Sequence, residues 1–277
     1  MRLALLLTAS LLAAPLSAEA GVCKTWSESL GLGQLDTSVI NEASGIEVSN
    51  RFAGRLYHHN DSGDTLRFFQ TDMTGGAMKV VNVDGPMPSD IEEMALGPCG
   101  SDSCIFLGDI GDNPGKRTEV AFTLVTEKAS FGATEPVRKV VRARYPDGNH
   151  NAEAFAIHPN GDLYLIVKPV DAVMMTPGAS AVYRLKAADL MANGDQVRTF
   201  EKIGSLDLPH LMPELPFFGH IVTGLDITQD GSRAVLLTYA AAVELGFDLS
   251  KGVPEKLVAG DNVSIFKAPP LSQQEAI

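Results

Sequence analysis

The sequence predicts an all-β fold, a β-propeller of about five four-stranded blades, with six as the alternative count and an incomplete last blade. Three observations predict it. Short apolar segments with similar beginnings recur at residues 44–48, 92–96, 153–157 and 223–227. A second short strand follows each of them across a turn rich in Gly, Pro, Asn or Asp, which is typical of β-hairpins. The chain also has 26 glycines and 16 prolines, which favours one β domain built from repeats.

The N-terminal residues 1–20 are expected to be a secretory signal peptide. Arg2 precedes an apolar run, and Ala18, Glu19 and Ala20 form a small-x-small cleavage site. Residues 21–277 then form a single β-propeller domain. No other stretch approaches the about 18 uninterrupted apolar residues of a membrane-spanning helix. We therefore expect a periplasmic or secreted protein with no membrane insertion after signal cleavage.

The charge balance is acidic. Lysine and arginine number 22 against 34 aspartates and glutamates, which gives a formal net charge of -12. Such a chain should repel nucleic acid and anionic membrane surfaces, so we expect no nucleic-acid partner. An acidic surface is compatible with cation binding, although acidity also serves solubility.

Each repeat unit is expected to contribute four strands. The segment at residues 21–41, with the single tryptophan, is expected to add an edge strand to the last blade. The predicted strands lie at residues 44–48, 55–60, 66–71 and 77–83; 92–96, 104–108, 120–126 and 137–145; 153–157, 162–168, 181–185 and 196–206; and 223–227 and 233–239, with 243–247 and 255–258 as further candidates. A short helix is expected at residues 186–191. The proline-broken loop at 208–219 is either a lid over one face or a loop packed outside a blade.

Two of the three cysteines are expected to form a disulfide. Cys99 and Cys104 bracket a short hairpin loop in a chain predicted to be exported, where such pairs oxidise. Closing so small a loop contributes about 2 kcal/mol at most by the loop-entropy argument. A zinc site is the weaker alternative, because the loop contains no histidine. Cys23 is left over.

Several motifs resemble those of a poorly characterised family of exported bacterial β-propeller proteins. Residues 57–64, YHHNDSGD, resemble a WHNDSGD element of that family. Residues 90–95, DIEEMA, are similar to its DWEDIA, residues 108–113 to its GDIGDN, and residues 145–154 to its YPDGPHDAEA. The order and spacing match over most of the chain. The resemblance implies a propeller fold and little chemistry; more distantly the chain is similar to phytase-like esterase, gluconolactonase and sugar-dehydrogenase propellers.

The sequence departs from that family at three places. His58 stands where the family has Trp, and Glu93 stands for Asp. Residues 274–277, QEAI, are similar to the beginning of another first strand, which in the family continues into a further blade. We therefore expect either an incomplete last blade or closure of the ring by the N-terminal segment.

Acidic residues near the strand ends are the candidate metal ligands. The first strand of a propeller blade lines the central channel, so side chains at its start should converge at the channel mouth. The predicted ligands are Asp61, Glu92, Asp109 and Glu153. Their oxygen atoms suit Ca²⁺ or another divalent metal such as Mg²⁺, whereas nearby His59 and His150 would suit Zn²⁺ or a transition metal. In the alternative interpretation these acids cap turns or form buried ion pairs with Lys168 or Arg184.

If a metal is bound, the predicted activity is metal-dependent hydrolysis of an ester, lactone or phosphoester. Glu92, Glu153 and His150 are the predicted catalytic residues, as ligand or base. No G-x-S-x-G nucleophile elbow and no P-loop are present. Whether the protein is an enzyme stays open: the alternative is a non-enzymatic propeller that binds a small molecule, a carbohydrate or a protein partner through its aromatic residues.

Overall fold

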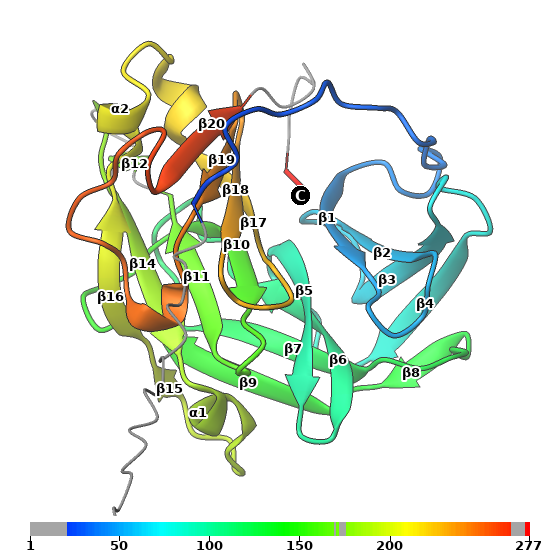
Figure 1. The fold of residues 1–277 in the computed structure, drawn as a ribbon. Helices are drawn as coiled ribbons and strands as arrows, with labels where there is room; N and C mark the ends of the chain where they lie inside the picture. The colour runs from blue at the N-terminus through cyan, green and yellow to red at the C-terminus, as the bar shows by residue number, and fades with distance from the viewer. Residues whose placement is uncertain (1–20, 169, 172–175, 267–274) are drawn as a thin grey trace, which may run out of the picture.

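Four β-sheets are arranged side by side around a central space (Figure 1). The computed structural model describes residues 21–168, 170–171, 176–266 and 275–277. The predicted signal peptide at residues 1–20 lies outside the described residues. The arrangement confirms the predicted all-β propeller fold. The described residues form four blades, so the predicted count of five or six is not confirmed.

Each blade is an antiparallel sheet whose inner strand comes first in the chain. The first blade contains β1 (Ala43–Val48), β2 (Arg55–Asn60), β3 (Arg67–Asp72) and β4 (Lys79–Asp84). The second contains β5 (Ile91–Cys99), β6 (Asp102–Asp109), β7 (Val120–Thr126) and β9 (Lys139–Arg144). The third contains β10 (Ala152–Ile157), β11 (Leu163–Val167), β14 (Ser180–Leu185) and β16 (Glu201–Leu206). The fourth contains β17 (Val222–Ile227), β18 (Ala234–Thr238), β19 (Ala242–Leu245) and β20 (Val263–Phe266).

Short elements connect the blades. β8 (Thr134–Pro136) pairs in parallel with β4, and β15 (Arg198–Thr199) pairs in parallel with β9, so each adds a fifth strand to the preceding blade. β12 (Val170–Asp171) and β13 (Thr176–Pro177) form a separate pair. The described helices are α1 (Ala187–Met191), α2 (Leu208–Leu211), η1 (Phe217–His220) and η2 (Leu249–Lys251). The last two are 3₁₀ helices, and α2 and η1 occupy the predicted loop at 208–219.

The predicted strands of the first three blades overlap the observed ones, except that residues 196–206 form two strands, β15 and β16, of which β15 pairs with the second blade. The fourth blade requires a further correction. Residues 255–258 contain no strand, and the outermost strand is β20. The backbone amide of Val258 donates to the side chain of Asn262 (2.8 Å), which places this stretch in a turn. β20 instead pairs in register with β19, with Val243 opposite Ile265.

The segment before β1 connects the fourth blade to the first. It forms no strand between residues 21 and 41, contrary to the predicted edge strand. The ring of Trp26 stacks on Phe266 of β20, with 3.9 Å between centroids. Further along, the amide of Gln34 donates to the carbonyl of Thr74 in the β3–β4 turn (3.1 Å). We call residues 23–34 the strap; it crosses above the central space in Figure 1.

The predicted disulfide is present between Cys99, the last residue of β5, and Cys104 of β6. Both cysteines are fully buried, and Cys23 is free. A disulfide is consistent with a periplasmic or extracellular protein. None of the helices in the described part of the chain has the length and apolar composition needed to span a bilayer.

Candidate cation site at the channel mouth

The inner strand of every blade contains a β-bulge at the same position. The register with the second strand shifts between Ala43 and Gly45, Ile91 and Glu93, Ala152 and Ala154, and Val222 and Gly224. The residues skipped by the pairing are Ser44, Glu92, Glu153 and Thr223, and all four are buried. A bulge re-aims a side chain, and bulges are frequent beside functional sites. We call this end of the channel, where the inner strands begin, the upper mouth.

Three carboxylates meet at the upper mouth. One oxygen each from Asp61, Asp90 and Glu92 lies within 4.8 Å of the other two. Asp61 directly follows β2, and Asp90 directly precedes β5. A Cβ atom on Gly111 would lie 2.2 Å from Asp90 Oδ2 and 2.4 Å from Glu92 Oε1, so glycine is needed here to leave room for both carboxylates. We call Asp61, Asp90 and Glu92 the upper acidic group.

The upper acidic group is electrostatically strained. Burial raises the pKa of Glu92 to about 8, and the charges of Asp61 and Asp90 act in the same direction. Burial, followed by the charge of Asp61, also raises the pKa of Asp90. Buried like charges favour uptake of a proton or a cation. The group is therefore suited to bind a positive charge at neutral pH.

Lys168 provides one positive charge beside this group. Its side chain is 10% exposed, and its ammonium contacts the Glu153 carboxylate, which confirms that predicted ion pair. Burial lowers the pKa of Lys168, while the charge of Glu92 opposes this shift. The second oxygen of Glu153, Oε2, is buried without a hydrogen-bond partner among the described residues. Burial and the charge of Asp61 also raise the pKa of Glu275, so several carboxylates surround one ammonium.

Three predicted site residues lie outside the upper acidic group: Glu153, which pairs with Lys168, and Asp109 and His150. Asp109 forms an ion pair with Arg117 (Oδ1–Nη1, 2.8 Å) and accepts a hydrogen bond from the amide of Asp90 (2.9 Å). It therefore positions Asp90. His150 Nε2 lies 3.0 Å from an Asp147 oxygen and 2.9 Å from the Tyr183 hydroxyl, in a polar and aromatic cluster between the second and third blades.

Three further residues of the sequence interpretation are His59, Asp61 and Arg184, the last as a possible ion-pair partner. His59 is fully buried behind Gly45, and its Nδ1 donates to the carbonyl of Asn60 (2.8 Å), whereas its Nε2 has no hydrogen-bond partner among the described residues. Burial lowers the pKa of His59 to about 4. Asp61 also caps its own turn by accepting from the amide of Ser62. Arg184 pairs with Glu201 on the outer strand rather than with an inner carboxylate.

Sequence reasoning missed Asp90 and Glu275 as members of the site. Asp90 begins the motif of residues 90–95, but it precedes the strand and carries no periodic signal. Glu275 occupies the bulge position when Gln274-Glu275-Ala276 is aligned with Ala152-Glu153-Ala154. An alignment of the inner strands on their bulge residue could therefore have identified Glu275.

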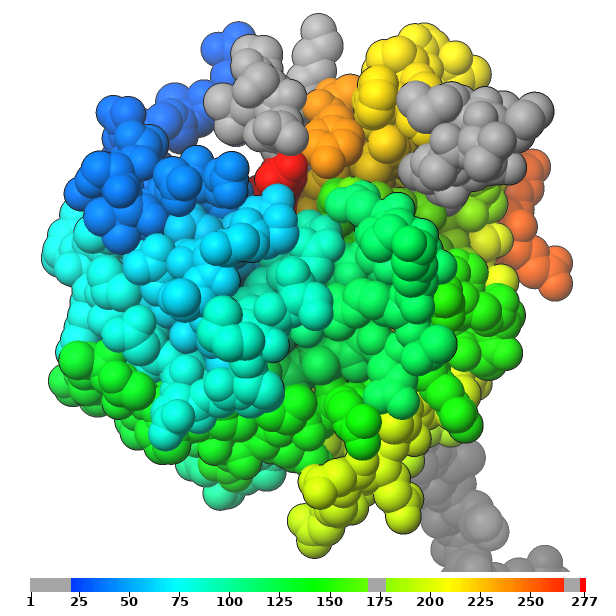
Figure 2. All heavy atoms as spheres, turned by 180° about the vertical axis from the view of Figure 1, so that it is seen from behind, coloured from blue at the N-terminus to red at the C-terminus, as the bar shows by residue number. Residues whose placement is uncertain are grey.

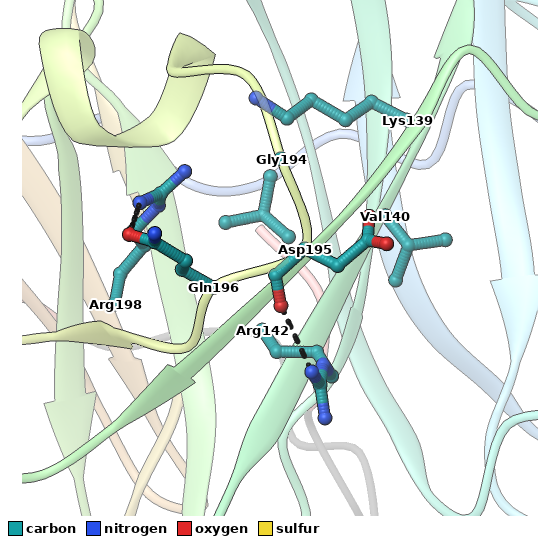
Figure 3. A pocket seen from close by; sticks show the side chains of 8 residues that line it. Lys139, Val140, Arg142, Gly194, Asp195, Gln196 and Arg198 are labelled. Atoms are coloured by element: carbon teal, nitrogen blue, oxygen red, sulfur yellow. Dashed lines mark hydrogen bonds between the residues drawn. The ribbon is translucent and has the colours of Figure 1, made fainter.

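A cavity of about 300 Å³ lies away from the upper mouth, between β9 and residues 194–198 (Figure 3). Its cationic side chains hold the loop after α1. Lys139 donates to the carbonyls of Leu190 and Ala192, and Arg142 donates to the carbonyl of Asp195 (2.9 Å). Because these cations are bonded to backbone oxygens, the cavity is best explained by loop packing.

No protein-family model and no curated protein matches the sequence. Solved structures with a similar arrangement include one titled streptogramin B lyase structure, at 10% identity and TM-score 0.40 over 84% of this chain and 57% of that chain. Kuenenia stuttgartiensis hydrazine synthase is 14% identical, with a TM-score of 0.38 over 80% of this chain and 58% of that chain. The structure of U3-55K is 10% identical, with a TM-score of 0.39 over 82% of this chain and 52% of that chain. The chain thus spans little more than half of each, and the similarity concerns the fold alone.

Proposed function

We propose that the protein is an exported, divalent-cation-binding propeller that hydrolyses a small ester, lactone or phosphoester at its upper mouth. The convergence of Asp61, Asp90 and Glu92 within 4.8 Å supports this proposal above all. Oxygen ligands of this kind suit Ca²⁺ or Mg²⁺. The raised pKa of Glu92 supports it further, because a bound cation would compensate the repulsion that burial creates.

The surrounding residues have distinct proposed roles. A divalent cation supplies Lewis-acid polarisation of the substrate oxygen and lowers the pKa of water. Glu153 is the proposed general base, because its Oε2 is buried and free of hydrogen bonds among the described residues. Lys168 holds the other oxygen of Glu153 and limits its rotation. His150 has no role in this proposal, because Asp147 and Tyr183 hold it elsewhere.

Cation binding is tested first by calorimetric titration of chelator-treated protein with CaCl₂, MgCl₂ and MnCl₂. Wild type should bind one equivalent of at least one of these cations. Asp90→Asn and Glu92→Gln each remove a proposed ligand, so the affinity should fall at least tenfold. Glu119→Gln is the matched control, because it removes one exposed acid that pairs with Arg142 far from the inner strands. If Glu92→Gln binds as tightly as wild type, the proposed site is wrong.

Hydrolysis is then tested with p-nitrophenyl acetate, p-nitrophenyl phosphate and γ-butyrolactone in the presence of the cation that binds. Glu153→Asp keeps the charge that pairs with Lys168 but withdraws the carboxylate. We expect it to retain cation affinity and to lose at least 10²-fold in kcat, the usual contribution of a general base. Cation binding by wild type without turnover of any substrate would instead favour the non-enzymatic ligand-binding propeller.

A further inference from the structure

A second set of carboxylates lies below the upper acidic group, toward the end of the channel where the inner strands end, which we call the lower mouth. It consists of Glu47 of β1, Glu93 of β5 and Asp226 of β17. Glu47 and Asp226 both line one cavity at this mouth, and Glu93 is buried on β5, which packs against β1. Burial, together with the charge of Asp226, raises the pKa of Glu47, which agrees with the shared cavity. The two cavity-lining acids and Glu93 thus come from three different blades.

The carboxylate of Glu93 is incompletely satisfied. The side chain is 1% exposed, and its Oε1 accepts from the amide of Met94 (2.9 Å). Its Oε2 has no hydrogen-bond partner among the described residues, although the Leu225 amide faces the carboxylate closely enough to lower its pKa. A buried, unpartnered carboxylate oxygen is costly unless a cationic or donor group reaches it.

The free oxygen of Glu93 lies beside a large cavity. Glu93 Oε2 is 3.4 Å, and the side chain of Ile277 is 3.3 Å, from the position that a Cβ on Gly224 would occupy. Ile277 lines a cavity of about 810 Å³ at the lower mouth, together with Glu47 and Asp226. Figure 2 shows residues 275–277, in red, among the blue, cyan, green and orange segments of the blades.

The lower carboxylates are too far apart to surround one metal ion. The three described acids with oxygens all within 4.8 Å of one another are those of the upper acidic group, and Glu47, Glu93 and Asp226 do not meet that spacing. The cavity between them also has apolar walls, contributed by Ile46, Leu96 and Ile157. Separate negative charges on an apolar lining suit a cation with several charged centres joined by methylene groups.

We propose that the lower mouth binds a linear aliphatic polyamine. Its ammonium groups would pair with Glu47, Glu93 and Asp226, and its methylene segments would pack against the apolar side chains of the inner strands. Asp102, which also lines the cavity, is paired with Arg138 (2.7 Å) and is not a proposed contact. Arg51 is the one basic residue among those that line the described cavity.

The test is calorimetric titration of the full chain with spermidine, beside 1,8-octanediol as an uncharged chain of similar length. Wild type should bind one spermidine and no octanediol. Glu47→Gln and Asp226→Asn should each weaken spermidine affinity at least tenfold, because each removes one partner of an ammonium group. Glu93→Gln should do the same, with circular dichroism confirming that each variant folds.

Two controls separate this site from the upper mouth and from nonspecific attraction to an acidic protein. Asp90→Asn and Glu92→Gln should change spermidine affinity less than twofold, even where they abolish binding of the divalent cation. Asp102→Asn removes a negative charge at the same cavity and should also have less than a twofold effect. Equal weakening by Asp102→Asn and Glu47→Gln would overturn the proposal, as would binding of an arginine-containing peptide without binding of spermidine.

Discussion

The carboxylate of Glu92 shows how a single residue acquires unusual chemistry from its surroundings. The bulge in β5 turns this side chain into the channel, where burial and two neighbouring aspartates disfavour its charged form. Its pKa of about 8, against an ordinary value of 4.5, means that the folded protein holds a proton that the unfolded chain has lost at neutral pH. This proton couples both stability and cation binding to pH.

At this scale we predict that the free energy of unfolding of cation-free protein falls as pH rises from 5 to 8. A group whose pKa is raised on folding stabilises the folded state fully at a pH below its pKa in the unfolded chain. That contribution is lost as the pH rises through its pKa in the folded protein. One pKa unit corresponds to about 1.4 kcal/mol, and part of the contribution is offset by Lys168. Urea unfolding of wild type and Glu92→Gln between pH 5 and 8 measures the difference.

The Glu92→Gln profile should be flatter than that of wild type, with the two proteins closest in stability at pH 5. Other buried acids, such as Glu47 and Glu93, are unchanged in both proteins and cancel in the comparison. Parallel profiles would contradict the raised pKa. The same proton opposes cation binding, so affinity for the divalent cation should increase between pH 6 and 8.5 in wild type.

At the scale of the element, close approach between inner strands and neighbouring blades depends on glycine. Gly108 of β6 lies against the ring of Phe155 of β10, which packs edge-on against Phe122 at 5.1 Å between centroids. A Cβ on Gly108 would lie 2.5 Å from Phe155 Cε1. In the same way, a Cβ on Gly97 of β5 would lie 2.2 Å from Cγ2 of Ile157, which is also on β10. The second and third blades therefore pack through glycine on one side and a large side chain on the other.

We predict that Gly108→Ala destabilises the protein by about 1–3 kcal/mol, the usual cost of overpacking a core. The backbone of Gly108 lies outside the left-handed region, so the effect is steric. Phe155→Leu makes room for the added methyl group, so the double variant should lose less than the sum of the single variants.

The free energies of unfolding in urea of wild type, the two single variants and the double variant form a double-mutant cycle. Gly31→Ala is the control, because a Cβ there meets nothing within 4 Å, and it should change stability by less than about 0.5 kcal/mol. Additive effects of Gly108→Ala and Phe155→Leu would show that the two residues do not press against each other.

At the scale of the whole molecule, the strap contacts both the first and the fourth blade, and residues of both blades line the lower mouth. Inner strands β1 and β5, β5 and β10, and β10 and β17 pack extensively against one another, whereas residues 275–277 lie between β17 and β1 (Figure 1). Across that junction, the side chain of Gln229 donates to Asn50. The strap reaches the same two blades through Trp26 and Gln34.

We predict that Trp26→Ala loosens the strap, because stacked aromatic pairs contribute about 0.5–1.5 kcal/mol beyond the area they bury. Limited digestion with trypsin should cleave after Lys24 several times faster in Trp26→Ala than in wild type, since local opening exposes this bond. Trp26→Phe keeps a ring on Phe266 and should digest at a rate close to that of wild type. Equal rates in the alanine and phenylalanine variants would show that the ring does not hold the strap.

Much of the architecture was predictable because propeller blades are made from local contacts. Hairpins between consecutive strands need only alternating side chains and the right turn residues, and both are visible along the chain. The disulfide between Cys99 and Cys104 was predictable for the same reason, since only a short loop separates the two. The exception, β20, lies beyond a turn held by Asn262, and its pairing with β19 depends on tertiary contacts.

The sequence by itself determined a repeated all-β fold and placed Glu92 and Glu153 at equivalent strand positions. Only the tertiary structure decided which carboxylates meet. Asp109 and Asp90 are both acids near the ends of strands, yet Arg117 neutralises the first while the second joins Asp61 and Glu92. Such choices depend on bulges, which change the direction of a side chain without changing composition, and on distances between blades that a strand pattern does not contain.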